Sequence, residues 1–264
     1  MFHVVKFLTI SFVHYRSALE IFKEMGWDSQ LKWMSGFLIS KPPFSPSLGW
    51  HQDGWYWNDE VAYQSNPAQI FAMYYLTDTT IANGCLRAIP GTHRKEHALH
   101  SQLGAAHSDE VRSSTKEWQD APEHASVEGE VNITVKAGDL VIGDARVLHG
   151  ARRNKTDSRR SLITLWYIPN YHDLNDEMRS SVEMLHRHQC GTLYDGDWNQ
   201  EAIDTLLEHD LLPDAAAESE DVVRASEYDH NLSMMHRTPG YLSTATPAAI
   251  RAFDIFGDDD RLTV

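Results

Sequence analysis

The chain has 264 residues, enough for one globular domain with a sizeable core, and a second domain is not required. A net charge of −15 argues against a nucleic-acid partner, because phosphate binding needs a basic face. Only two cysteines occur, Cys85 and Cys190, so we expect no disulfide framework and a reducing, cytoplasmic location. The apolar stretch 4–13 is too short to cross a membrane, so no membrane partner is expected.

The chain begins with a predicted helix. Charged residues separate Leu19, Phe22 and Met25 within residues 17–27, a pattern typical of an amphipathic helix that ends at Gly26. The preceding stretch 4–13 is interpreted as an ordered edge element or a helix.

Strands follow the helix. Residues 33–40 predict a strand closed by the Pro42–Pro43 pair, and residues 69–77 predict a second one. Further strands are predicted at 131–135, which alternates, and at 139–144, which follows a turn at Gly138.

Two parts of the chain lack the strand pattern. Residues 94–130 are polar and histidine-rich without a clear period, so we expect a lid or a surface insertion. Residues 170–264 are interpreted as a helical C-terminal extension, with helices at 175–188, 199–209 and 247–256.

A candidate metal site is the most informative feature. His51 and Asp53 are two residues apart, so on a strand both side chains leave the same face. His149, after a β-rich run, is the best candidate for a third ligand, and Asp144 and Arg146 are expected to pair or to orient it. Two histidines and one carboxylate leave coordination positions open, as in non-haem Fe(II) oxygenases. Structural zinc prefers four protein ligands, usually with cysteine among them, so this set of three residues does not suit it.

Arg160 supplies a second feature, because it opens the apolar run 161–167. A guanidinium at the start of a buried strand needs an anion, and a dicarboxylic cosubstrate offers a bidentate partner. This pattern favours an organic acid as a cosubstrate.

Together these motifs resemble the phytanoyl-CoA dioxygenase family of Fe(II)- and 2-oxoglutarate-dependent oxygenases. The matching motifs run in family order from about Phe37 to Pro169: Lys41-Pro42-Pro43, His51-Gln52-Asp53, Asn83-Gly84-Cys85-Leu86, Pro90-Gly91-Thr92-His93, Gly138-Asp139, His149-Gly150, Asn154-Lys155-Thr156 and Arg160.

The resemblance implies a mainly β fold with helical decoration and a double-stranded β-helix (jelly-roll, cupin-like) core. We expect one domain over 1–264 with its core at about 33–169. The implied cofactors are Fe(II), 2-oxoglutarate and O₂. Iron would be held by His51, Asp53 and His149, and the distal carboxylate of 2-oxoglutarate by Arg160 with help from the Ser161 hydroxyl.

Phe37 and Met73 match family positions that line the 2-oxoglutarate pocket. Each is as well explained as an ordinary core side chain, and methionine more often has that role.

Four residues are candidates for substrate contact. Trp55 and Trp57 follow the ligand motif, and aromatic rings there would line the mouth of the site, although core packing explains one of them as well. Gln69 shares the predicted strand face of Met73. Arg152 belongs to a basic cluster beside His149 that would suit a CoA thioester, and a solvated turn explains that cluster equally well.

The predicted function is therefore oxidation, in the first place hydroxylation, of an unactivated C–H bond of a small organic substrate, with release of succinate and CO₂. A secondary metabolite is preferred as substrate over an acyl-CoA. Halogenation is not expected, because related halogenases lack the carboxylate that Asp53 supplies. The alternatives are a metal-only cupin isomerase or dioxygenase and a non-catalytic small-molecule-binding protein. A monomer and a homodimer are both compatible with the sequence.

Overall fold

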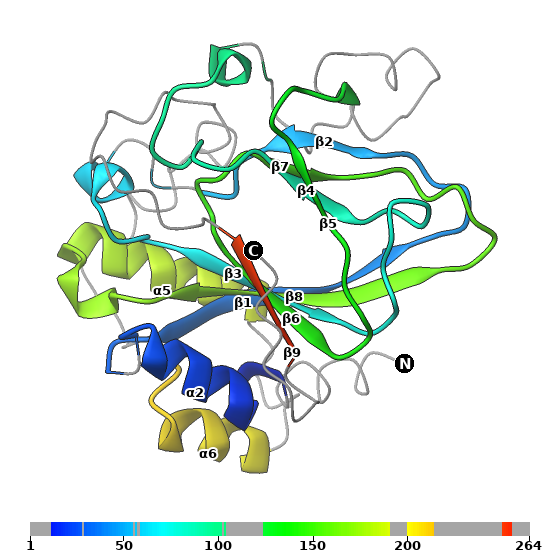
Figure 1. Ribbon diagram of the computed structural model, residues 1–264. Coiled ribbons are helices and arrows are strands. Elements are labelled where there is room, and N and C mark those ends of the chain that lie inside the picture. The colour runs from blue at the N-terminus through cyan, green and yellow to red at the C-terminus, as the bar shows by residue number, and fades with distance from the viewer. Residues whose placement is uncertain are drawn as a thin grey trace.

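In the computed structural model the described residues are 12–27, 29–54, 56, 59–101, 103, 124–190, 200–213 and 250–254. In these ranges the strands form two antiparallel sheets that face each other (Figure 1). The larger sheet has the order β1-β8-β3-β6-β9 and comprises β1 (Lys32–Lys41), β8 (Arg160–Ile168), β3 (Ile70–Tyr75), β6 (Asp139–Asp144) and β9 (Ile250–Asp254). The smaller sheet has the order β2-β7-β4-β5 and comprises β2 (Leu48–His51), β7 (His149–Ala151), β4 (Leu86–Ala88) and β5 (Val131–Ile133).

The space between the sheets is filled from both sides. Apolar side chains of the larger sheet meet Leu86 of the smaller one in a buried cluster that also contains Phe71, Met73, Tyr75, Val135, Val141, Val147 and Leu162. The β3 members are alternate residues, and Leu162 and Trp166 of β8 share the same face of the sheet, as the two-residue period of a strand requires. The predicted mainly β fold with a double-stranded β-helix core is confirmed.

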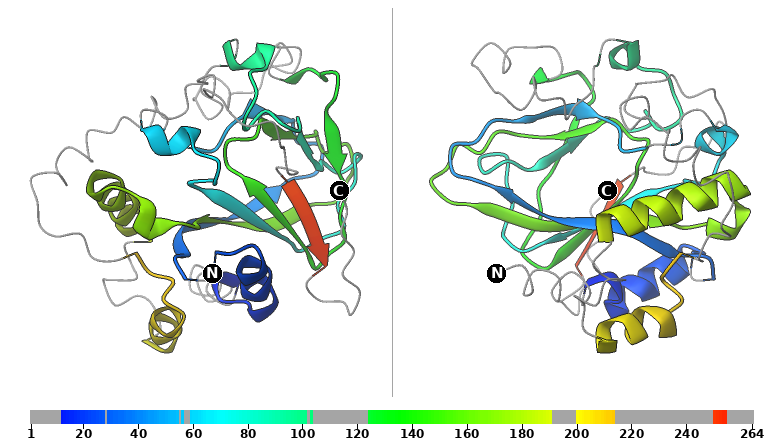
Figure 2. Two further views of the ribbon diagram at one scale, coloured as in Figure 1. Left: turned by 60° about the vertical axis from the view of Figure 1, so that its left-hand side comes forward. Right: turned by 180° about the vertical axis from the view of Figure 1, so that it is seen from behind.

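Helices cover the outer face of the larger sheet. Phe22 of α2 (Arg16–Glu24) and Leu206 of α6 (Gln200–Glu208) pack on alternate residues of the sheet, among them Ile163 and Leu165. Figure 2 shows both helices on the side of that sheet away from the smaller sheet. The third helix, α5 (Asp176–Cys190), packs beside β1.

Short 3₁₀ turns complete the described elements: η1 (Glu60–Tyr63), η2 (Ala98–Ser101) and η4 (Tyr171–Asp173). Gly26 follows α2 with φ of +81°, a left-handed conformation suited to glycine, so the predicted helix stop is confirmed.

One predicted element is wrong. The sequence pattern suggests a helix over 247–256, but residues Ile250–Asp254 form strand β9, which pairs antiparallel with β6 at the edge of the larger sheet. The β6 edge offers backbone donors and acceptors to this segment, and such tertiary pairing overrides a weak local preference. The C-terminal region is therefore not wholly helical.

Other expectations fall largely outside the described residues. These are the element at 4–13 and most of the insertion at 94–130, of which residues 94–101, 103 and 124–130 are described. Among the described helices none has the length and hydropathy needed to cross a membrane.

Candidate metal centre

The two histidines are brought together by strand pairing. His51 ends β2, His149 begins β7, and the two are direct partners in this antiparallel pair, with ring centroids 4.2 Å apart. Asp53 lies two residues beyond the end of β2, where its backbone N–H donates to the Ala145 carbonyl at 2.8 Å. Residues nearly a hundred positions apart therefore share one site.

Backbone carbonyls fix the orientation of both rings. His51 Nδ1 lies 2.8 Å from the Gly49 carbonyl oxygen, and His149 Nδ1 lies 3.0 Å from that of Val147. A carbonyl only accepts, so Nδ1 carries the proton in each ring and Nε2 keeps its lone pair. This arrangement is typical of metal-binding histidines.

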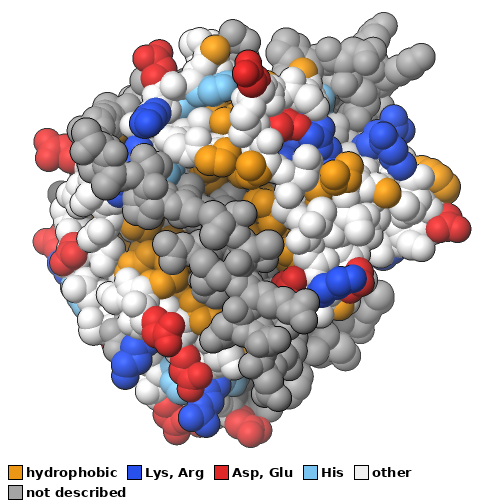
Figure 3. Space-filling view, viewed as in Figure 1, with side chains coloured by type: hydrophobic (Ala, Val, Ile, Leu, Met, Phe, Trp, Pro, Cys, Tyr) orange, Lys and Arg blue, Asp and Glu red, His pale blue; other side chains and the backbone are white. Residues whose placement is uncertain are grey.

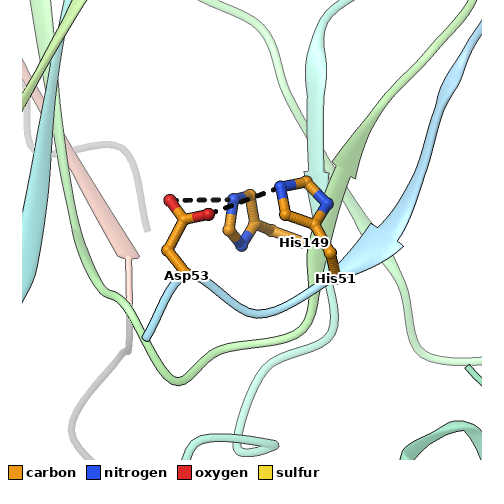
Figure 4. Close-up of side chains that lie close together, drawn as sticks. All are labelled: His51, Asp53 and His149. Atoms are coloured by element: carbon orange, nitrogen blue, oxygen red, sulfur yellow. Dashed lines mark ion pairs between the residues drawn. The ribbon is translucent and has the colours of Figure 1, made fainter. Parts of the chain in front are cut away.

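The Nε2 atoms of the two rings and the Asp53 carboxylate converge (Figure 4). His51 Nε2 lies 3.6 Å from Asp53 Oδ1, and His149 Nε2 lies 3.6 Å from Asp53 Oδ2. One ligand atom from each of the three residues lies within 4.8 Å of the others. Two imidazole nitrogens and one carboxylate suit a non-haem Fe(II) site with open positions, so these residues fit the metal that the sequence suggests.

The turn that precedes His149 is held by a buried ion pair. Arg146 donates through Nε and Nη2 to the two Asp144 carboxylate oxygens at 2.9 and 2.7 Å. Its Nη1 donates to the carbonyls of Ala62 and Gln64. The expectation that Asp144 and Arg146 pair is confirmed, and the pair ties the turn to the segment after η1.

Close packing fixes the imidazole of His149 from the other side. The Phe71 ring centroid lies 5.0 Å from that of His149, and Phe71 crosses over Gly143 of the neighbouring strand. A Cβ at Gly143 would collide with the Phe71 ring, so a side chain there would force the ring to move. Glycine is needed here for the close approach.

Arg160 is the buried cation of the site. Its residue is 4% exposed, Nη2 donates to the Gly84 carbonyl at 2.9 Å, and Nε has no hydrogen-bond partner. Within the described ranges no carboxylate forms an ion pair with it. Burial lowers the pKa of Arg160, while nearby Tyr75 and Cys85 oppose that shift. A buried guanidinium with an unused donor fits an anionic ligand.

The proposed pocket walls lie on neighbouring strands. Phe37 and Met73 are the direct partners of Thr164 on the two sides of β8, so the three side chains share one face of the sheet. Met73 is buried in the inter-sheet cluster, whereas Phe37 is 50% exposed. Gln69, just before β3, is buried, and its Oε1 has no hydrogen-bond partner.

Two expected contacts are not supported by their positions. Ser161 shares the strand face of Ile163 and Leu165, which pack against the helices, so it lies on the opposite face from Arg160. Arg152 is engaged elsewhere, because its guanidinium donates to Asn132, Ser126 and the Glu130 carboxylate. Glu130 also pairs with Arg87, so these contacts hold the Arg152 guanidinium in place at this position. Trp55 and Trp57 lie outside the described residues.

Sequence reasoning did not single out Trp166 or Thr164. The Trp166 indole Nε1 donates to Asp53 Oδ2 at 3.0 Å across 113 positions of sequence. The Thr164 side chain is fully buried, and its hydroxyl has no hydrogen-bond partner. Thr164 and Trp166 follow Arg160 by four and six residues on one strand, and this even spacing was a signal for a shared face but not for these contacts.

The family model for phytanoyl-CoA dioxygenase matches residues 10–162, more than half of the chain, and includes all three candidate ligands and Arg160. The chain belongs to the phytanoyl-CoA dioxygenase family. Membership and the ligand triad together imply Fe(II) and 2-oxoglutarate as the cofactors.

Curated relatives of this family member match part of it. An ectoine dioxygenase of Nocardia farcinica is 31% identical over 123 residues, which cover 44% of this chain and 40% of the relative. A probable alpha-ketoglutarate-dependent hypophosphite dioxygenase of Stutzerimonas stutzeri is 25% identical over 127 residues, 48% of this chain and 41% of the relative. The match thus spans less than half the length of these relatives.

Among solved structures, the nickel complex of the non-heme monooxygenase ThoJ is 26% identical, with a TM-score of 0.43. The match covers 60% of this chain and 52% of that one.

Proposed function

We propose that this family member is an Fe(II)- and 2-oxoglutarate-dependent dioxygenase that hydroxylates an unactivated C–H bond of a small organic substrate. Succinate and CO₂ are the other products. The observation that carries the proposal is the convergence of two histidine Nε2 atoms and one carboxylate. The buried guanidinium of Arg160, which has an unused donor and no carboxylate partner within the described ranges, supports the choice of cosubstrate.

Each residue has a role that its surroundings support. His51, Asp53 and His149 hold the iron through the ring nitrogens that the backbone carbonyls leave free and through the carboxylate. Arg160 anchors the distal carboxylate of 2-oxoglutarate by a charge-assisted pair. When bound, iron, 2-oxoglutarate and O₂ supply the oxidising chemistry, and the protein supplies placement. Asp53 leaves no place for a halide ligand in its position, which favours hydroxylation over halogenation.

The pocket walls favour an apolar or aromatic substrate. Phe37 is half exposed on the inner strand face and contacts Trp166 edge to face at 5.6 Å. Figure 3 shows hydrophobic side chains near the centre of this face of the molecule, where Figure 1 shows the sheets facing each other, and charged side chains mostly toward the rim. A secondary metabolite suits such walls. An acyl-CoA would need a basic patch, and the guanidinium of Arg152, the candidate for it, is held by Glu130, Asn132 and Ser126.

Two other interpretations are less well supported. A metal-only cupin gives no reason for the buried, partly unsatisfied guanidinium of Arg160. A non-catalytic binding protein gives no reason for three ligand residues with preset ring orientations. We further propose one domain over 1–264, with 94–130 as a lid or insertion, and a monomer or homodimer in solution.

The first experiment is an anaerobic titration with Fe(II) and then 2-oxoglutarate, followed by visible absorption. We expect the weak charge-transfer band of a chelated 2-oxoacid to appear, and to be lost in Asp53→Ala. Iron binding without the band would contradict the choice of cosubstrate and favour the metal-only cupin. No iron binding would contradict the metal site itself.

A second experiment addresses the substrate class. Succinate release is measured for a panel of small aromatic and alicyclic compounds and for a matched panel of acyl-CoA thioesters, each against the uncoupled background. Stimulation by the first panel supports the proposal. Stimulation by the thioesters alone would instead show an acyl-CoA hydroxylase.

A further inference from the structure

Asp53 differs from the two histidines in how its side chain is held. His51 and His149 belong to paired strands, and each ring is fixed by a backbone carbonyl. Asp53 lies outside the regular part of β2, and backbone pairing with Ala145 fixes its Cα but not its carboxylate. A short side chain in that setting needs a partner to hold one orientation.

Trp166 provides that partner. Its indole Nε1 lies 3.0 Å from Asp53 Oδ2, the oxygen that also faces His149 Nε2 at 3.6 Å. The other oxygen, Oδ1, faces His51 Nε2. Indole N–H is a donor only, so it donates to the carboxylate oxygen, and an ionised carboxylate, which is also the form that binds a metal, is the stronger acceptor.

The donor itself is fixed by the fold. Trp166 lies in the second half of β8, an interior strand of the larger sheet, with Ser35 of β1 and Phe71 of β3 as its direct partners. The Phe37 ring contacts the indole edge to face at 5.6 Å, and the Trp166 side chain packs partly buried against the inter-sheet cluster. An indole on an interior strand, in contact with Phe37 and packed against the inter-sheet cluster, is a firm support for a carboxylate outside the strands.

We propose that Trp166 is a positioning residue for the metal site: its indole N–H holds the Asp53 carboxylate toward the two histidine Nε2 atoms. The inference rests on the proposed metal site and assigns to this chain a support for the ligand triad that lies on a different strand from all three ligands. Trp166 acts through Asp53, and the proposal requires only that it donate a hydrogen bond.

The test is metal affinity, measured without turnover. Co(II) is titrated anaerobically into the protein by calorimetry, with the visible Co(II) bands recorded in parallel. Loss of a hydrogen bond to a metal-ligating residue typically weakens metal binding about 10- to 100-fold. We therefore expect Trp166→Phe to weaken Co(II) binding by about tenfold or more, and the shape of the Co(II) spectrum to change because the carboxylate is no longer held.

Two further variants distinguish an effect of the lost hydrogen bond from an effect of altered packing. Replacement of Trp166 by 3-benzothienylalanine keeps the bicyclic shape and puts sulfur in place of the N–H, so it should weaken Co(II) binding as Trp166→Phe does. Trp27→Phe is the matched control, since Trp27 packs against Phe22 of α2 on the outer face and should leave the affinity unchanged.

The outcomes are distinct for the two proposals. Failure of the wild-type protein to bind Co(II) would overturn the metal site and this inference together. Wild-type binding that is retained within twofold in Trp166→Phe would overturn the inference alone. Retained affinity in the benzothienylalanine protein, with loss in Trp166→Phe, would show that the ring packs rather than donates and would also overturn it.

Discussion

Lys41 lies directly opposite Arg160 across the antiparallel pair of β1 and β8. Its Nζ donates to the Pro46 carbonyl at 2.5 Å, and no described carboxylate forms an ion pair with it. Burial first, and the charge of Arg160 second, lower the pKa of Lys41 to about 8. Two neighbouring cations of this kind favour a dianion such as 2-oxoglutarate more than a singly charged acid.

This relationship predicts a pH dependence of cosubstrate binding. Near pH 7 Lys41 is charged in the free protein, and binding needs no proton uptake. As pH rises above about 8, Lys41 loses its proton in the free protein. A bound dianion raises the pKa of Lys41, so binding above pH 8 is coupled to uptake of a proton by Lys41. The 2-oxoglutarate Kd should therefore increase between pH 8 and 9, by at most roughly tenfold per pH unit.

The measurement is the absorption titration with 2-oxoglutarate at pH 7, 8 and 9, made on the wild-type protein and on Lys41→Met. The variant should bind more weakly at pH 7 and show a flatter pH profile. If Lys41→Met keeps the wild-type increase, some other group is responsible for it.

Arg160→Gln should raise the KM for 2-oxoglutarate, because it removes the anchor for the distal carboxylate. Loss of a hydrogen bond to a charged group costs about 2–3 kcal/mol, which corresponds to an increase of roughly 30- to 150-fold. Arg159→Gln, at the neighbouring position, is the control. Arg159 is exposed, and its guanidinium donates a hydrogen bond to the Ser40 hydroxyl. Equal effects of the two substitutions would mean that general positive charge, not the Arg160 position, determines the affinity.

The sequence signals for the ligand pair and for a buried cation are local, whereas the place of His149 beside them depends on the pairing of β2 with β7. His51 and Asp53 are separated by one residue, Arg160 begins an apolar run, and the strand period assigns each side chain to a face. The same period explains why Ser161 is not beside Arg160: adjacent residues of a strand point to opposite faces.

Contacts that depend on the packing of distant segments were not predictable. Nothing local to Trp166 indicates that its indole meets a carboxylate 113 residues earlier. Arg152 looked available beside His149, yet a glutamate from the preceding segment pairs with it. Strand β9 forms because the β6 edge lies beside it, a condition that the sequence of 250–254 does not contain.

Asp144→Asn should destabilise the fold, because Asp144 neutralises the buried guanidinium of Arg146. Removal of one partner from a buried ion pair typically costs about 3–5 kcal/mol. Urea unfolding followed by circular dichroism measures the change, and Asp78→Asn, which loses an exposed pair with Lys136, should have a much smaller effect. A wild-type free energy of unfolding in Asp144→Asn would show that the two carbonyls alone satisfy Arg146.

Two buried histidines predict loss of stability in mild acid. Burial lowers the pKa of His93 to about 4, where Asp144 opposes the shift and Arg146 and Arg94 add to it. Burial likewise lowers the pKa of His186 to about 4, against the opposing hydrogen bonds to the backbone of Met34 and Trp33. Unfolding exposes both rings and restores an ordinary pKa of about 6.5, so the unfolded state binds more protons between pH 6.5 and 4.

The free energy of unfolding should therefore be highest above pH 6.5 and fall as the pH decreases toward 4, by up to about 1.4 kcal/mol per pH unit for each histidine. Urea unfolding at pH 7, 6 and 5 measures this slope. His93→Gln and His186→Gln should each reduce it, whereas His172→Gln, at an exposed position, should not. An unchanged slope in both buried variants would assign the acid sensitivity to other groups.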